Sequence, residues 1–235
     1  MTMDRLEALR DHIFAALACG DERAARKGIK KLQRHAPAEA AGLLTALHIE
    51  AGRADAALAA WHECAKYAPR DPYTAFLRAR IYLLEGARCA ALEVLEPLID
   101  APIPAEIAEK VYNLAGQCAR FLGRAAEAVN FYERARDAAP DLALKALNAS
   151  NVLFNRHYLP ATLVEDRGAA SEYGALFAAV RQFDHTAHRR GTRLRIGYLS
   201  PDVREHVVLS FSYALMTALD PARFEVTVYA LNAED

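Results

Sequence analysis

The sequence lacks long apolar runs and has almost no net charge, and each shortage excludes a class of protein. No run reaches the stretch of about 18 apolar residues that a membrane-spanning helix needs. The formal net charge is −1, which argues against broad attraction to nucleic acid or to an anionic membrane. The first residues, MTMDRLEALR, carry acids early and are unlike a secretory signal. We therefore expect a cytoplasmic protein that binds neither nucleic acid nor membranes.

Candidate metal ligands are also scarce. The chain has four cysteines, none of them in a Cys-x-x-Cys pair: Cys19, Cys64, Cys89 and Cys118. Each falls in a helical pattern among apolar neighbours, so we expect buried thiols rather than disulfides or metal ligands. His185 and His188 have a spacing that a helix could use for a metal, but they lie in a polar, arginine-rich stretch without a third ligand. We expect no metal site.

Repetition, by contrast, is abundant. Glycines at positions 20, 52, 86 and 123 are 32, 34 and 37 residues apart. Five residues after each glycine stands an alanine: Ala25, Ala57, Ala91 and Ala128. Nine residues after each stands a bulky side chain: Ile29, Trp61, Leu95 and Tyr132. Seventeen residues after three of them stands a proline: Pro37, Pro69 and Pro140. A period near 34 residues indicates stacked copies of one small unit.

Each repeated residue has a physical role in a pair of antiparallel helices. Glycine allows the tight turn after the first helix, and alanine lets the second helix approach the first closely. The bulky residue four positions later lies on the same face and fills the interface, and proline separates one pair from the next. This pattern resembles the tetratricopeptide repeat. We predict an α-solenoid over residues 1–158, with about four repeats and a closing helix near 143–157. The resemblance implies a groove that binds partner or acceptor proteins.

A junction follows the array. Pro160 ends the closing helix, and Thr162 to Glu165 have the form of a capping box that opens another helix, expected to run to about Phe183. An arginine-rich connector comes next. We predict that residues 159–192 form a linker helix and a basic connector.

Residues 193–235 have a different pattern. A short apolar run from Leu194 predicts a strand, residues 207–219 predict an amphipathic helix, and residues 224–231 predict a second strand. Strand, helix and strand in this order are typical of a Rossmann-like parallel sheet. One such unit buries too little surface to be a domain, so we expect it to be the first β-α-β unit of a larger α/β domain.

Three segments carry a more specific resemblance. After the repeats come SNVLFNRHYLP, RIGYLSPDVREHVV and FEVTVYALN, in that order. This order is similar to that of the protein O-GlcNAc transferases and the SPINDLY-type enzymes, in which a tetratricopeptide array leads into a two-lobed GT-B glycosyltransferase. The resemblance implies transfer of a sugar, N-acetylglucosamine first, from a UDP-GlcNAc-like donor to Ser or Thr of acceptor proteins. We expect no cofactor in this chain and no activity from it alone, because the donor-binding second lobe is absent.

The resemblance also points to individual residues. The family's R-I-G-Y-[VL]-S-x-D-F-x-x-H segment matches residues 195–206 except at Val203, and it makes His206 the catalytic or acceptor-side histidine. At a helix start, a neutral imidazole could accept a proton from the attacking hydroxyl or orient the acceptor. The alternative is a histidine that caps or packs the helix. Ser200 and Asp202 are expected to shape the turn and cap the helix.

The family's groove asparagines are mostly missing. Asn148 keeps the amide that would bind an acceptor, whereas the equivalent positions are Leu43, Leu77 and Leu114. Two rival functions stay open. One is a protein-binding scaffold without catalysis, and the other is an enzyme with a fucosyl donor or an Asn acceptor.

Overall fold

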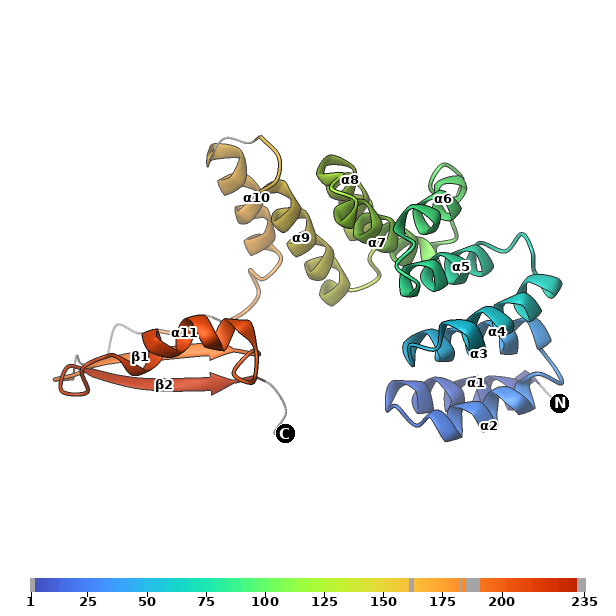
Figure 1. Ribbon diagram of the computed structural model, residues 1–235, viewed down its shortest axis with the longest axis horizontal. Helices are drawn as coiled ribbons and strands as arrows, with labels where there is room; N and C mark the ends of the chain where they lie inside the picture. The colour runs from blue at the N-terminus through green and yellow to red at the C-terminus, as the bar shows by residue number, and fades with distance from the viewer. Residues whose placement is uncertain (1–2, 161–162, 182, 185–190, 232–235) are drawn as a thin grey trace. The chain divides into compact units, whose positions relative to one another are not determined.

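The chain folds into two units, Met1–Ala179 and Val180–Asp235. The computed structural model describes residues 3–160, 163–181, 183–184 and 191–231 (Figure 1). Thr162, His185 and His188, about which the sequence made predictions, lie outside these residues. No helix in the described ranges is long and apolar enough to cross a bilayer.

In the described part of the first unit, all regular secondary structure is α-helical. Its helices are α1 (Met3–Ala18), α2 (Glu22–Leu32), α3 (Pro37–Glu50), α4 (Ala54–Tyr67), α5 (Pro72–Leu84), α6 (Arg88–Ile99), α7 (Ala105–Phe121), α8 (Ala125–Asp137), α9 (Leu142–Arg156) and α10 (Leu163–Ala175). Consecutive helices pack as pairs, and the first helices of neighbouring pairs also touch, α3 on α5 and α5 on α7. The first unit is therefore an α-solenoid of stacked helix pairs, as predicted.

The repeated glycines act as the sequence predicts. All four adopt positive φ: Gly20 (76°), Gly52 (68°), Gly86 (78°) and Gly123 (75°). The residue after each glycine donates its backbone N–H to a carbonyl five residues back, as Arg53 does to His48 at 2.9 Å. This hydrogen bond satisfies a carbonyl of the last helical turn and fixes the reversal of the chain. The same turn recurs four times because the same local chemistry recurs.

The packing residues of the repeat are also where they were expected. The four repeated alanines are fully buried between their helices. Ile29, Leu95 and Tyr132 are buried, whereas Trp61 is half-buried and donates its indole N–H to the carbonyl of Thr74 at 2.8 Å. These side chains fill the interfaces between pairs, so the core of the array is a series of small clusters along its length.

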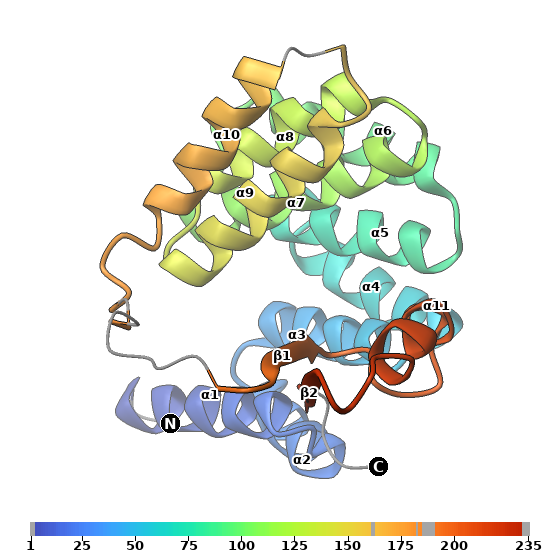
Figure 2. The same cartoon turned by 90° about the vertical axis from the view of Figure 1, so that its left-hand side faces the viewer.

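The end of the array differs from the prediction. The closing helix is α9, but α10 packs against it and belongs to the first unit (Figures 1 and 2), so the expected linker of residues 159–192 is divided between the units. The prediction that α10 extends to about Phe183 was wrong, because the helix ends at Ala175 and tight turns follow. Val180 and Phe183 are 63% and 77% exposed. Without burial of its apolar side chains, further helix gains little stability.

The cysteine prediction was half right. Cys64 and Cys118 are buried, and burial raises the pKa of the Cys118 thiol to about 11. Cys19 and Cys89 are exposed, against expectation. Cys19 lies in the turn after α1, and Cys89 is in the first turn of α6, where the helix faces solvent. Apolar neighbours in the sequence did not reveal which side of the helix each thiol occupies.

The second unit is the predicted β-α-β element. Strands β1 (Leu194–Ser200) and β2 (Phe224–Ala230) pair in parallel, with Leu194 opposite Phe224 and Ser200 opposite Ala230. Helix α11 (Val207–Thr217) connects them, and the hydroxyl of Tyr198 donates to the carbonyl of Leu215 at 3.3 Å. None of the described residues of this unit is buried, and Phe211 is 84% exposed. The unit therefore presents an uncovered apolar surface.

Candidate functional site

A groove runs along the first helices of successive pairs and is the first candidate site. It is lined by Glu50 of α3, by Tyr73, Phe76, Arg80 and Leu83 of α5, by Glu109, Lys110, Asn113, Leu114 and Gln117 of α7, and by Leu144 and Leu147 of α9. Arg80 donates to Glu50 at 2.7 Å, and Leu147 is 52% exposed. Apolar side chains alternate here with amides and with charges of both signs, a lining that suits an extended polypeptide.

Asn148 lies beneath this lining and is fully buried. Its Nδ2 donates to Glu109 Oε1 at 2.7 Å and to the carbonyl of Leu144 at 3.0 Å. Its Oδ1 accepts a hydrogen bond from Asn113 Nδ2 at 2.6 Å. Both hydrogens of the amide are thus used inside the protein. To bind an acceptor, Asn148 would have to exchange these partners for the ligand.

Asn113 and Gln117 are the amides that reach the groove. Gln117 Nε2 donates to Asn113 Oδ1 at 2.6 Å, and both side chains are half-buried. The sequence prediction missed them because it considered one position in each repeat. The sequence did contain a signal for them: Asn113 and Gln117 are four residues apart, a spacing that places both amides on the same face of α7. Leu43, Leu77 and Leu114 are buried, so at this position the other repeats contribute apolar packing.

The loop between β1 and α11 is the second candidate site. Ser200 Oγ accepts a hydrogen bond from the backbone N–H of Asp202 at 3.0 Å, so Ser200 shapes the turn as predicted. The N-cap of α11 is His206, whose Nδ1 accepts a hydrogen bond from the backbone N–H of Val208 at 3.2 Å. Asp202 Oδ1 lies 3.9 Å from the same nitrogen. His206, rather than Asp202, therefore caps this helix.

The cap limits what His206 can do chemically. Because Nδ1 uses its lone pair to accept the Val208 N–H, the proton of a neutral ring is on Nε2. Nε2–H can donate a hydrogen bond to an oxygen of a bound molecule, and the side chain is 38% exposed. In this geometry, Nε2 cannot accept a proton. A role as general base would first require His206 to leave its capping position.

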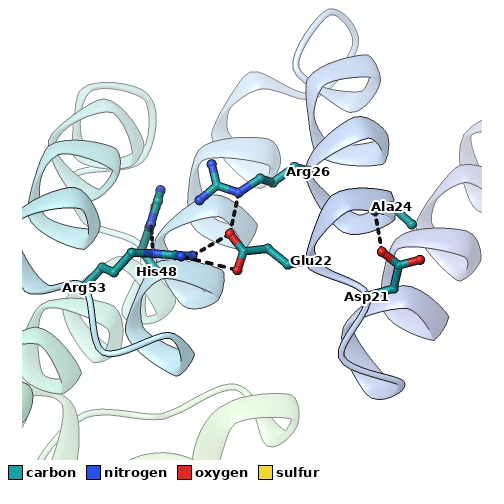
Figure 3. Close-up of polar contacts among 6 residues, drawn as sticks. All are labelled: Asp21, Glu22, Ala24, Arg26, His48 and Arg53. Carbon is teal, nitrogen blue, oxygen red and sulfur yellow. Dashed lines mark hydrogen bonds and ion pairs between the residues drawn. The ribbon is translucent and has the colours of Figure 1, made fainter.

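Figure 3 shows a charged cluster at the turns of the first two pairs. Glu22 Oε1 accepts hydrogen bonds from Arg26 Nε and from Arg53 Nη2, each at 2.7 Å. Arg53 Nε also donates to His48 Nδ1 at 3.1 Å. Burial, followed by the charges of Arg26 and Arg53, lowers the pKa of His48. Since Glu22 belongs to one pair and Arg53 to the next, this cluster joins neighbouring pairs. The described residues contain no cluster of metal-ligating side chains.

The lowered pKa of His48 predicts a loss of stability in mild acid. The neutral ring is favoured in the folded state, so its stabilising contribution is complete above the unfolded pKa of about 6.5 and is lost as the pH falls below it. In urea unfolding between pH 7.5 and 5, wild type should lose more stability than His48→Asn, in which the amide can still accept from Arg53. His12→Asn, a change at an exposed histidine, should leave the wild-type pH dependence intact. Equal pH dependence in wild type and His48→Asn would contradict this.

Solved structures are similar to this chain at low sequence identity. No family model matches it, and neither does any curated protein. A crystal structure of a MamA protein is 14% identical, with a TM-score of 0.52 over 77% of this chain and 98% of that one. MamA from Desulfovibrio magneticus RS-1 is 15% identical, with a TM-score of 0.52 over 77% of this chain and 100% of that one.

A mutant of the O-GlcNAc transferase of Thermobaculum terrenum is also similar. It is 22% identical, with a TM-score of 0.51 over 100% of this chain. This chain spans 39% of that structure. At these identities the likenesses show the fold alone: a mainly α-helical tetratricopeptide-type solenoid followed by a β-α-β unit.

Proposed function

We propose that the two units are the N-terminal portion of a protein O-glycosyltransferase. The enzyme would move a sugar, N-acetylglucosamine first, from a UDP-GlcNAc-like donor to Ser or Thr hydroxyls. The observation that carries this proposal is the match of the transferase structure over 100% of the chain, whereas the MamA structures match about three quarters of it. A cytoplasmic setting fits the exposed thiols of Cys19 and Cys89, which stay reduced there.

The groove of the first unit would hold the acceptor protein. Asn113 and Gln117 offer amides at its surface, and Leu147 and the half-buried Leu83 offer apolar contacts. Asn148 would act from below, because its hydrogen bond to Asn113 fixes the orientation of that amide. In this proposal, Asn148 positions the groove amides, and direct contact with acceptor backbone falls to Asn113.

His206 would lie on the acceptor side of the active site. It follows β1, and parallel α/β sheets bind their ligands beyond the carboxyl ends of the strands. The proton on Nε2 would donate a hydrogen bond to an oxygen of the acceptor or the donor, which orients that oxygen for the reaction. The nucleotide-sugar would bind mainly outside these two units, because this chain spans 39% of the similar transferase structure and no described residue of the β-α-β element is buried.

A scaffold without catalysis is the second candidate, and one observation favours it. The imidazole of His206 is already engaged as a helix cap, a purely structural use. The helix array would then be the functional part, and its groove would bind partner proteins.

Sugar transfer by the protein isolated from its native cells tests the proposal. The protein would be incubated with labelled UDP-GlcNAc, or with GDP-fucose as the alternative donor, and with a protein extract from the same cells. Mass spectrometry then locates the sugar on Ser, Thr or Asn. Transfer to Ser or Thr from the first donor is expected. Retention of extract proteins without any sugar transfer would support the scaffold instead.

A further inference from the structure

An aromatic pocket lies where α7 and α9 end, apart from the groove. Its lining consists of Arg120, Phe121, Gly123, Ala125, Phe154, Asn155 and Tyr158, none of which lines the groove. Phe121, Phe154 and Tyr158 are 54%, 50% and 66% exposed. The rings of Phe154 and Tyr158 meet edge to face, 5.8 Å apart. Clustered exposed aromatic rings are typical of a surface that a partner covers.

Arg120 lines this pocket, and Arg88 lies beside it on the same Phe121 ring. The guanidinium carbons of Arg88 and Arg120 lie 4.7 and 4.6 Å from the ring centre of Phe121. Within the described residues, neither arginine forms an ion pair with an acid. The Nε atom of each is buried without a hydrogen-bond partner. An arginine that stacks on an aromatic ring and has N–H groups without an acceptor is suited to binding a carboxylate.

Asn155 supplies an unsatisfied acceptor at the same pocket. The residue is 1% exposed, and its Nδ2 donates to the carbonyl of Asn151 at 2.8 Å. That hydrogen bond fixes the orientation of the Asn155 amide. If the amide were flipped, its Oδ1 would face the carbonyl oxygen of Asn151. Oδ1 is therefore a buried acceptor without a donor among the described residues. Leaving such an atom unpaired costs stability, which a ligand N–H would restore.

We propose that this pocket binds an extended acidic segment of a partner protein. The partner's carboxylates pair with Arg88 and Arg120, its backbone N–H donates to Asn155 Oδ1, and an apolar side chain packs on Phe154 and Tyr158. The choice of a peptide rests on the presence of unpaired donors and an unpaired acceptor together. A phosphate ion offers acceptors almost exclusively and would leave Asn155 without a donor. This site does not depend on sugar transfer.

The test uses the full 235-residue chain and two pools of 12-residue peptides. One pool is built from Asp, Glu, Phe and Leu, and the other replaces the acids with Asn and Gln. Equilibrium dialysis followed by mass spectrometry measures how much of each pool the protein retains. We expect the acidic pool to bind about tenfold more tightly, as charge-assisted hydrogen bonds predict. Inorganic pyrophosphate should compete poorly with it.

Substitutions in the pocket test whether the acidic peptides bind there. Arg120→Gln combined with Tyr158→Ala should reduce retention of the acidic pool by about tenfold. Tyr67→Ala combined with Arg70→Gln removes the same chemical groups from an exposed surface elsewhere and should change nothing. Asn155→Ala should weaken binding while thermal melting followed by circular dichroism confirms that the chain is folded.

Four results would overturn the proposal. They are equal retention of the two pools, no retention of either at millimolar peptide, equal loss in the pocket variant and in its matched control, and competition by pyrophosphate as strong as that of the acidic peptides. The last result would make the pocket a general anion site. None of these outcomes bears on whether the protein transfers sugar, so failure here leaves the proposed function standing.

Discussion

Tyr132→Ala is expected to lower the free energy of unfolding by about 3–5 kcal/mol, the range for removal of a large buried aromatic side chain. Tyr132 is 1% exposed and packs with Ala119 of α7 and Val152 of α9, so its ring joins three helices. Because each pair in a solenoid is held mainly by its neighbours, the loss should separate the last helices from the rest of the array. Urea unfolding followed by circular dichroism measures the effect. Tyr67→Ala, at a residue 57% exposed, should cost less than about 0.5 kcal/mol.

Gly116 of α7 faces the Tyr132 ring across this interface and allows a second test of the same packing. A Cβ atom at Gly116 would lie 2.9 Å from the Tyr132 ring, closer than the packing allows. Gly116→Ala alone should therefore cost about 1–3 kcal/mol through overpacking. In the Tyr132→Ala background, the added methyl group enters the space the ring has left, so the same change should cost much less. Additive effects of the two substitutions would contradict this account of the interface.

The largest expected effect on activity comes from His206. In the native protein, His206→Ala should reduce sugar transfer by about 10²-fold or more, through loss of an oriented hydrogen bond to the reacting groups. That substitution also removes the helix cap, which is worth about 1 kcal/mol. His206→Asn separates the two roles, because asparagine can accept from the Val208 N–H but has no imidazole.

His206→Asn is expected to be as inactive as His206→Ala while its α11 is as stable as that of wild type. Hydrogen exchange at the Val208 amide monitors the cap directly. Recovery of full activity in His206→Asn would mean that His206 serves the reaction only by capping α11.

Features that depend on a few neighbouring residues could be predicted from the sequence. The glycines at 52 and 123 end their helices because glycine tolerates positive φ, a property of the backbone at one residue. The same holds for the β-α-β unit, whose strands and helix follow from apolar alternation and periodicity. Such signals stay within one element and need no knowledge of what packs against it.

Features that depend on distant helices could not be predicted. The amide of Asn148 donates a hydrogen bond to Glu109, a buried carboxylate from another helix pair, and no local sequence pattern predicts that contact. The exposure of Cys89 and the early end of α10 likewise depend on which surfaces other helices cover. His206 shows both kinds of feature. Its position at the start of the helix was predicted, but the use of Nδ1 as the capping atom was not.

The measurement that tests the central claim most directly is transfer of labelled N-acetylglucosamine by the wild-type protein, isolated from its own cells at its native length. Sugar is expected on Ser or Thr residues of the co-incubated proteins. A protein that transfers no sugar from either donor would contradict the claim and leave a binding scaffold.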